Sequence, residues 1–279
     1  MPTTDRTVLS SLSAPLVLVG AGKMGGAMLE GWLNLGLPPQ QVVVLDPKPS
    51  DEIAALAARG IRVNPPAAGI GTAGVVVAAV KPQVAADVIP SLAAHIGPDT
   101  LVVSIMAGKT LAFLEHLLPA STAVVRSMPN TPAAIGRGIT VAVGNARVSP
   151  AQRSLADTLL AATGAVEWVD DEALMDAVTA VSGSGPAYVF LLAEVLAQAG
   201  EKAGLPPDLA ARLARLTVTG SGELLHRSPL DAATLRQNVT SPGGTTAAAL
   251  EVLMAADGLA PLMVKAIAAA AKRSRELAG

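Results

Sequence analysis

A glycine-rich turn near the start of the chain, Val19–Gly26, most constrains what the chain can fold into. It follows the apolar run Leu16–Val19 and precedes residues with helical spacing, so the local order is strand, turn, helix. Gly20, Gly22 and Gly25 match G-x-G-x-x-G. In that pattern the first glycine allows a tight turn, the second lets a pyrophosphate approach the backbone, and the third lets helix and strand pack closely. Free N–H groups at the helix start favour phosphates, so the turn predicts dinucleotide binding.

An acidic residue strengthens this interpretation, because a glycine-rich turn alone is a weak signal. Asp46 ends the next apolar run, Val42–Leu45, at about the spacing of a carboxylate that binds the adenosine ribose. The alternative, a turn with no ligand, does not need that carboxylate. We therefore expect a dinucleotide site.

Further β-branched and apolar runs alternate with helical patterns, which is typical of a parallel, doubly wound sheet. The expected helices of this part are Asp51–Arg59 and Pro150–Ala162. The expected further strands are Ile61–Val63, Val75–Val80, Leu101–Ile105, Ala123–Arg126, Thr140–Val143 and Ala165–Val169.

Beyond Val169 the sequence predicts only helices, with breaks at glycine and proline clusters that include Gly183–Pro186. We expect a disordered tail over 1–14, a Rossmann dinucleotide-binding domain over 15–169, and an all-helical dimerisation and substrate domain over 170–279. The predicted helices are Glu172–Val181, Pro186–Ala203, Pro207–His226, Leu230–Gln237, Thr245–Ala255 and Leu259–Leu277.

Length and composition limit the domain number, the binding partners and the chemistry of the chain. The 279 residues suit two domains. A net charge of -2 without a basic run argues against a nucleic-acid partner, and the absence of cysteine excludes disulfide and thiolate chemistry. The uncharged stretch Pro65–Val80 is broken by Pro and Gly and predicts no membrane span. The mean hydropathy of +0.49 is high, which favours a homo-oligomer that buries apolar helix faces between subunits. We expect a cytoplasmic protein with a small-molecule substrate.

Ligands of open parallel sheets bind outside the carboxyl ends of the strands, where unusual turns fall in this chain. Besides the glycine turn these are Ala79–Pro82, Ile105–Gly108 and Met128–Pro132. Each alone is explained by an ordinary loop, but together they favour a site. Lys81 either pairs with a phosphate or ribose oxygen or is a solvated lysine at a strand end.

A second unusual stretch, Asn238–Thr246, interrupts the helical part with the sequence NVTSPGGTT. Backbone N–H groups at the following helix start, beside hydroxyl groups, suit a carboxylate. The alternative is an ordinary turn capped by threonine. His95, His116 and His226 are expected to be solvated, so no proton relay is evident. That favours hydride transfer to an already protonated C=N bond, in which the cofactor carries the chemistry.

Six segments resemble the pyrroline-5-carboxylate reductase family: GAGKMGGAM (20–28), AVKPQ (79–83), SIMAG (104–108), RSMPNTPA (126–133), DAVTAVSGSGPAYVF (176–190) and NVTSPGGTTAAALEVL (238–253). They span most of the chain in the family's order. The resemblance implies a Rossmann domain, an all-helical dimerisation domain and an active site between them. It also implies reduction of (S)-1-pyrroline-5-carboxylate to L-proline by NADPH or NADH, the last step of proline biosynthesis.

The resemblance also implies roles for individual residues. Thr246 is the candidate catalytic residue, through a hydrogen bond near the ring nitrogen. Substrate contacts are implied for Glu172, Gly243, Gly244, Thr245 and Thr246. Cofactor contacts are implied for Gly20, Ala21, Gly22, Lys23, Met24, Gly25, Asn64, Ala79, Val80, Lys81, Pro82, Ile105, Met106, Ala107 and Asn238. No metal is implied.

Asp46 and Lys48 bear on the choice of cofactor. Many relatives carry small hydroxyl residues at the position of Asp46, where they receive the 2′-phosphate of NADP. An aspartate repels that phosphate and favours a free 2′-hydroxyl. Lys48 offsets part of the repulsion, so we expect use of both NADH and NADPH.

Two alternatives remain open. Imine reductases and β-hydroxyacid dehydrogenases also join a Rossmann domain to helices, and the latter resemble G-x-G-x-x-x-K-x-x-x-N. From Gly183 onward, Val189 and Ala193 occupy the lysine and asparagine positions, which argues against hydroxyacid oxidation. A non-catalytic dimeric NAD-sensing module is the alternative of another class, but it does not need the SPGGTT turn.

Overall fold

The computed structural model describes residue 9 and residues 12–278, and it divides the chain into two compact units. The sheet unit comprises Met1–Gly183 with Ala271–Gly279, and the helical unit comprises Ser184–Ala270. The predicted disordered tail, 1–14, lies mostly outside the described residues. Within it, Leu9 is buried in the core of the sheet unit and Leu12 packs against that core.

An eight-stranded sheet with the order β3-β2-β1-β4-β5-β6-β7-β8 forms the sheet unit, which confirms the predicted Rossmann class. Neighbouring strands pair in parallel, except that β6 and β7 pair antiparallel. The sheet is therefore mostly parallel, as predicted. The strands are β1 (Leu16–Val19), β2 (Val42–Leu45), β3 (Arg62–Val63), β4 (Ala73–Ala78), β5 (Ile96–Ser104), β6 (Ala123–Met128), β7 (Gly138–Gly144) and β8 (Gly164–Trp168).

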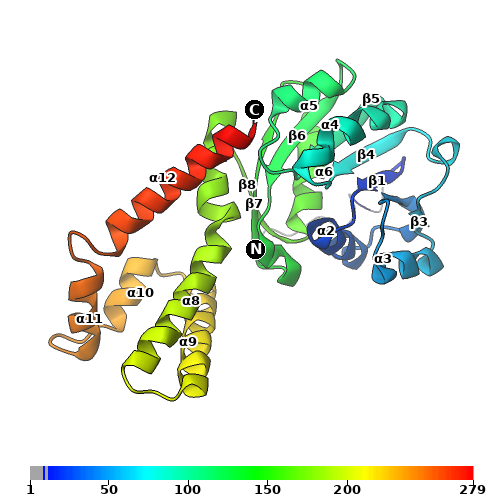
Figure 1. Ribbon diagram of the computed structural model, residues 1–279. Coiled ribbons are helices and arrows are strands. Elements are labelled where there is room, and N and C mark those ends of the chain that lie inside the picture. Colours follow the sequence, from blue (N-terminus) through cyan, green and yellow to red (C-terminus); the bar gives the residue numbers. More distant parts are fainter. Residues whose placement is uncertain (1–8, 10–11, 279) are drawn as a thin grey trace. The chain divides into compact units, whose positions relative to one another are not determined.

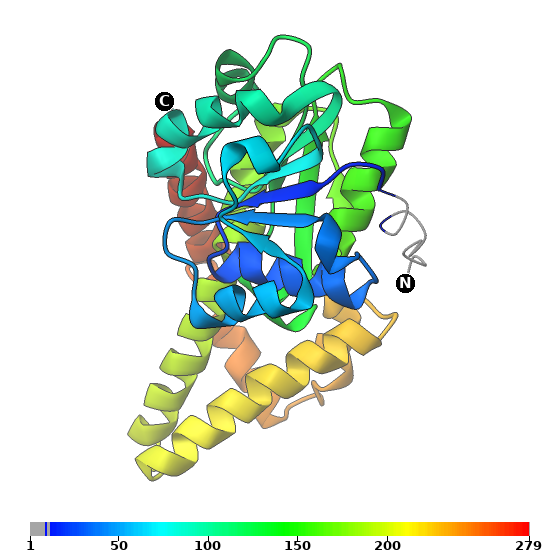
Figure 2. The same ribbon diagram turned by 90° about the vertical axis from the view of Figure 1, so that its right-hand side faces the viewer.

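Helices cover both faces of the sheet (Figures 1 and 2). Side chains that alternate along each strand form one buried layer on each face. On one face, Leu16 and Leu18 of β1 pack with α2 (Lys23–Asn34), α3 (Asp51–Ala55) and α6 (Pro150–Ala161). On the other face, Val17 and Val19 pack with α4 (Ala85–Val88), the 3₁₀ helix η5 (Ile89–His95) and α5 (Leu111–Leu117). Because helices cover both faces of the sheet, the central strands consist of continuous runs of apolar residues.

The helix that follows the glycine turn is anchored at its far end. Trp32 of α2 is fully buried, and its indole Nε1–H donates to the backbone oxygen of Leu159 in α6 at 2.8 Å. A buried aromatic residue with its polar atom satisfied fixes the helix firmly. This contact ties the last turn of α2 to α6.

The predicted helix break at Gly183–Pro186 is shorter than expected. The 3₁₀ helix η7 (Glu172–Leu174), α7 (Met175–Val178) and the π-helical turn η8 (Thr179–Gly183) end at Gly183, Ser184 forms a bend, and α8 (Gly185–Lys202) begins at the next residue. The π turn accommodates the glycines, and Pro186 lies in the first turn of α8, where its missing N–H costs no hydrogen bond.

The helical unit confirms the prediction of an all-helical C-terminal domain. Its elements are α8, α9 (Pro207–Arg227), α10 (Ala232–Asn238), α11 (Thr245–Leu253) and the first part of α12 (Leu259–Ala278). α8 and α9 pack closely, since a Cβ on Gly200 would lie 3.4 Å from the Cβ of Ala210. The last turns of α12 belong to the sheet unit, where Ser274 Oγ donates to Asp176 Oδ1 at 2.6 Å.

Large apolar side chains of the helical unit face outward. The most exposed include Phe190 at 68%, Val252 at 72% and Val264 at 70%. One helical stretch, Glu172–Lys202, is long and apolar enough to cross a membrane by length and composition, with a hydropathy of 1.4 in its most apolar window. The stretch Pro65–Val80 does not form such a helix, because it contains β4. The helical unit thus exposes an apolar surface that is larger than expected for helices whose outer faces contact water.

Candidate functional site

The carboxyl ends of four neighbouring strands meet at one edge of the sheet. Backbone hydrogen bonds join Gly20 N to Leu45 O at 2.8 Å, Ala79 N to Val19 O at 2.8 Å, and Ile105 N to Ala78 O at 3.0 Å. The turns after β1, β2, β4 and β5 are therefore adjacent in space. The residues that the sequence predicts for the cofactor in these turns are brought together.

The glycine turn has the geometry that its sequence predicts. Gly20 has φ +89°, and a Cβ there would lie 2.8 Å from the backbone oxygen of Ala79. A Cβ on Gly25 would collide with the backbone oxygen of Gly20, so α2 approaches the turn more closely than any side chain permits. A Cβ on Gly22, in contrast, would meet nothing within 4 Å, so that side of the turn is open.

The N-terminus of α2 offers an anion site beside that opening. Gly22 is the N-cap residue, no side chain caps the helix, and its first turn holds no acidic residue. Gly22 and Lys23 are exposed. The first N–H groups of a helix have no partner within the helix and lie at the positive end of its dipole. The turn thus fits a dinucleotide pyrophosphate, with Gly22, Lys23 and Met24 as its backbone donors.

Asp46 lies beside the turn and is held in place by hydrogen bonds. Its Oδ2 accepts from Ala21 N at 2.7 Å and its Oδ1 accepts from Lys48 N at 2.8 Å. Asn64, at the end of β3, donates through Nδ2 to Asp46 O at 2.7 Å and accepts from Asp46 N at 2.9 Å through Oδ1. Asn64 has φ 48°, a conformation that Asn tolerates better than most residues. The structure therefore joins three predicted cofactor residues, Ala21, Asp46 and Asn64.

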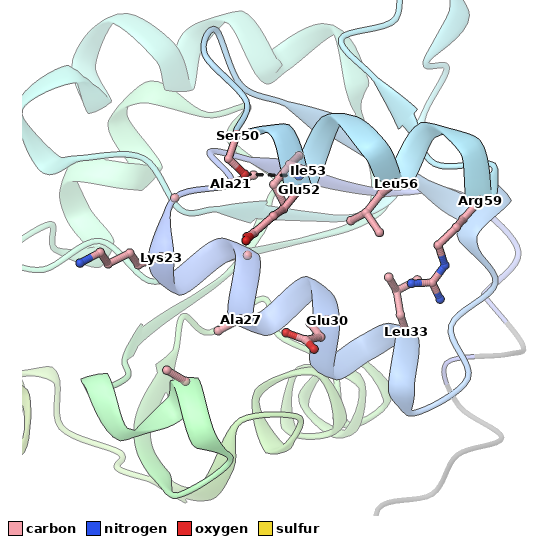
Figure 3. A pocket seen from close by; sticks show the side chains of 13 residues that line it. Ala21, Lys23, Ala27, Glu30, Leu33, Ser50, Glu52, Ile53, Leu56 and Arg59 are labelled. Carbon is pink, nitrogen blue, oxygen red and sulfur yellow. Dashed lines mark hydrogen bonds between the residues drawn. The ribbon is translucent and has the colours of Figure 1, made fainter.

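A cavity of about 670 Å³ extends from this turn between α2 and α3 (Figure 3). Its lining at the turn comes from Ala21, Gly22 and Lys23. Glu52 reaches from α3 toward α2, whereas the ammonium end of Lys23 points away from α3 (Figure 3). The remaining lining residues are Gly26, Ala27, Glu30, Leu33, Ser50, Ile53, Leu56, Arg59 and Ala134.

Two further turns complete the edge. Lys81 is exposed and precedes the 3₁₀ helix η4 (Pro82–Val84), with Val80 beside it. After β5, Ile105 is half-buried, Met106 is buried and Ala107 is exposed. Met106 N donates to Ser104 Oγ at 3.3 Å, which fixes the start of this turn. Both interpretations of Lys81, a phosphate partner and a solvated lysine, are compatible with its exposed position.

Glu172 lies at the centre of a small polar cluster in the sheet unit. Its Oε1 accepts from Arg126 Nη1 and from Leu111 N, both at 2.7 Å. The side chain of Arg126 is 5% exposed and that of Glu172 is 28% exposed. Arg126 is not among the predicted site residues. A charged residue in a strand that is otherwise apolar indicates a buried ion pair, because a buried charge requires a partner, and this pattern is visible in the sequence.

The SPGGTT turn of the helical unit leads into the open N-terminus of a second helix. Gly243 has φ 68°, and Gly244, which caps α11, has no side-chain hydrogen bond at the cap. The structure therefore contradicts the alternative of a threonine cap, because the N-cap of α11 is Gly244. Thr245 is exposed and Thr246 is half-buried in the first turn of α11. Asn238, the last residue of α10, precedes the turn.

α10, which carries Asn238, has a firmly capped start. Asp231 accepts a hydrogen bond from Thr234 N at 2.7 Å. That backbone hydrogen bond, with a side-chain bond from the same Thr234, lowers the pKa of Asp231. A charged carboxylate at an N-cap stabilises the helix start.

One expectation about the histidines is wrong. His95 is 6% exposed, and its Nδ1 lies 3.1 Å from the backbone oxygen of Gly71, because the end of η5 lies beside the loop that precedes β4. It lies toward the amino ends of the strands, away from the predicted cofactor edge. Among residues 9 and 12–278, no cluster of three or more His, Cys, Asp or Glu side chains forms a metal site.

Comparison with known proteins decides the family. Residues 172–277 match the model described as pyrroline-5-carboxylate reductase dimerisation, and residues 15–108 match that of NADP oxidoreductase coenzyme F420-dependent. A pyrroline-5-carboxylate reductase of Pseudomonas aeruginosa is 42% identical over 96% of this chain and 98% of its own length. The chain belongs to the pyrroline-5-carboxylate reductase family.

Solved structures of the reductase family share the fold over the whole chain. The pyrroline-5-carboxylate reductase of Coxiella burnetii superimposes with a TM-score of 0.87 at 33% identity, covering 96% of this chain and all (100%) of its own. The Plasmodium falciparum pyrroline carboxylate reductase, solved with NADP bound, gives 0.79 at 28% identity, covering 96% of this chain and 99% of its own. The oxidoreductase class and the use of an NAD(P)H cofactor follow from these relatives.

Proposed function

We propose that this chain is a pyrroline-5-carboxylate reductase, which reduces the C=N bond of (S)-1-pyrroline-5-carboxylate to give L-proline with NAD(P)H as the hydride donor. The observation that carries the proposal is the presence of two open helix N-termini in the segments that resemble the family. α2 begins at Gly22 and α11 begins after Gly244, and neither has a side-chain cap. One suits a pyrophosphate, and the other suits the substrate carboxylate.

The cofactor residues of the proposal line the sheet edge. Backbone donors from Gly22 to Met24 bind the pyrophosphate, and Asp46 faces the adenosine ribose. Asn64 acts through its two hydrogen bonds to the backbone of Asp46. The other proposed contacts are Gly20, Ala21, Gly25, Lys48, Ala79, Val80, Lys81, Pro82, Ile105, Met106, Ala107 and Asn238.

The substrate is held through its carboxylate and its ring nitrogen. The N–H groups of Thr245 and Thr246 lie in the first turn of α11 and face the carboxylate, while Gly244 N donates to Ser241 O at 3.1 Å and brings the turn close to the substrate. The Thr246 hydroxyl forms one hydrogen bond near the ring nitrogen. Gly243 gives the turn its left-handed backbone. Glu172 is a further substrate contact. When bound, the nicotinamide cofactor supplies the hydride that reaches the ring carbon, so the contribution of these residues is proximity and orientation.

The proposal includes a homo-oligomer assembled through the helices after Glu172. Its support is the match of 172–277 to a dimerisation family together with the exposed apolar side chains of the helical unit. A partner subunit that covers α8 would also explain why Glu172–Lys202 is apolar without invoking a membrane. We further propose a cytoplasmic location, where NAD(P)H is available, and no nucleic-acid partner.

Oxidation of NADH or NADPH in the presence of racemic 1-pyrroline-5-carboxylate tests the proposal. We expect oxidation that depends on this substrate and yields proline. Oxidation of a β-hydroxyacid instead would favour the dehydrogenase alternative, which Val189 and Ala193 disfavour because its lysine and asparagine are missing. Cofactor binding without any turnover would favour the non-catalytic sensor.

A further inference from the structure

We propose that this chain binds NADH in preference to NADPH, because its adenosine-ribose site is built against a 2′-phosphate. The inference rests on the proposed function and specifies which cofactor that site selects. It sharpens the expectation from Asp46 and Lys48 that both cofactors are used, by stating which of them is preferred.

The first support is that the Asp46 carboxylate is fixed in place. Ala21 N and Lys48 N each donate to a different oxygen of it, at 2.7 and 2.8 Å. A rotation that withdrew the carboxylate from the ribose site would break both bonds. The Ala21 bond also ties it directly to the turn that fits the pyrophosphate. A phosphate on the ribose 2′-oxygen would therefore meet a negative group that has no alternative position.

The second support is the difference between the two helix starts that flank the cavity. α2 has no side-chain cap and no acid in its first turn, as a pyrophosphate site requires. α3 follows the loop that carries Asp46, and it is closed to anions. Ser50 Oγ accepts from Ile53 N at 3.3 Å, and Asp51 and Glu52 occupy the first turn.

The third support is the charge of the loop after β2 together with the first two residues of α3. Residues 46–52 read DPKPSDE, with three acids and one lysine. Glu52 lines the cavity and reaches toward α2 (Figure 3). Lys48 is exposed, and an exposed charge contributes little against a fixed carboxylate. The local charge thus favours a ribose that carries two hydroxyl groups.

Binding of cofactor fragments to the full-length protein isolates the ribose site. ADP-ribose and 2′-phospho-ADP-ribose differ only in the 2′-phosphate, and calorimetry measures their dissociation constants without turnover. We expect ADP-ribose to bind at least about tenfold more tightly than its 2′-phosphate. The same order is expected for NADH over NADPH by fluorescence titration.

Variants that each remove one charge test whether Asp46 and Lys48 cause the preference for NADH. Asp46→Asn keeps an oxygen acceptor but removes the charge, and we expect it to reduce the preference to within about threefold. Lys48→Ala should widen the preference. Asp99→Asn is the matched control, because this exposed aspartate lies toward the amino end of β5 and its loss should not change the ratio.

Three results would overturn the inference. Equal or tighter binding of the 2′-phosphorylated ligands by the unaltered protein contradicts it directly. A ratio that is the same in Asp46→Asn and in Asp99→Asn shows that the carboxylate does not face the 2′ position. Failure to bind either cofactor overturns the proposed function as well, whereas tight NADPH binding with turnover overturns this inference alone.

Discussion

Replacing Arg126 by alanine is expected to destabilise the sheet unit, because it leaves the Glu172 carboxylate without its cationic partner. The Nη1–Oε1 distance is 2.7 Å, and the arginine side chain is 5% exposed. Removal of one partner of a fully buried ion pair costs about 3–5 kcal/mol. Glu172 is 28% exposed and keeps its bond from Leu111 N, so water and one N–H donor still reach its carboxylate. We therefore expect a loss of about 2–3 kcal/mol in the free energy of unfolding.

The chain contains a matched control for this substitution. Arg147 Nη1 lies 2.6 Å from Glu115 Oε1, and the side chains are 44% and 37% exposed. Glu115 Oε1 also accepts a second N–H, from Asn145 Nδ2 at 2.8 Å. The two pairs thus differ mainly in burial. Arg147→Ala should cost less than about 1 kcal/mol.

Urea-induced unfolding, followed by circular dichroism at one protein concentration, measures both effects. A constant concentration is needed because oligomerisation contributes to apparent stability. We expect a clear shift of the urea midpoint for Arg126→Ala at an unchanged slope. An equal loss of stability in the two alanine variants would show that burial does not strengthen the Arg126–Glu172 pair. If Glu172 contacts substrate, Arg126→Ala also raises KM for 1-pyrroline-5-carboxylate, and Arg147→Ala does not.

Three further predictions concern the cofactor turn, the substrate turn and the assembly. Gly22→Ala should fold normally, because its Cβ meets nothing within 4 Å. It should bind NADH more weakly, because the added methyl group lies where the pyrophosphate approaches the backbone. An unchanged dissociation constant for NADH would contradict this placement of the pyrophosphate. Thr246→Ala should lower kcat/KM by the equivalent of about 1–3 kcal/mol with little change in the urea midpoint. Unaltered kinetics in the folded variant would remove Thr246 from the site. Sedimentation at sub-micromolar concentration should show at least a dimer, and a stable, active monomer would disprove assembly through the helices after Glu172.

The sequence predicts the sheet edge well because the residues there have few alternatives. Gly20 needs a left-handed backbone and Gly25 has no room for a side chain, so a glycine pattern reports the turn directly. The apolar runs of β1 and β4 report burial on both faces. The spacing of Asp46 from the turn then follows from the length of one helix and one strand.

Features that depend on tertiary contacts were not predictable in the same way. Glycine and proline at Gly183–Pro186 indicate a break, but the π turn η8 extends to Gly183 and leaves only a bend at Ser184 before α8 begins. A Cβ on Gly183 would collide with Met128 Cε, so this glycine serves a contact with a distant strand end. His95 was assigned to solvent because nothing in its local sequence reveals the backbone oxygen of Gly71. The Arg126–Glu172 pair joins residues 46 positions apart, and only the fold brings them together.

We expect this chain to deliver a hydride to the C=N carbon of a cyclic imino acid. The most direct measurement uses NADH that carries deuterium at both C4 positions of the nicotinamide, with racemic 1-pyrroline-5-carboxylate as substrate and mass spectrometry of the product. We expect proline with one deuterium on the former imine carbon, the ring carbon next to nitrogen that does not bear the carboxylate, and a much smaller yield from Thr246→Ala. Proline without deuterium, or no proline while the protein still binds NADH, would contradict it.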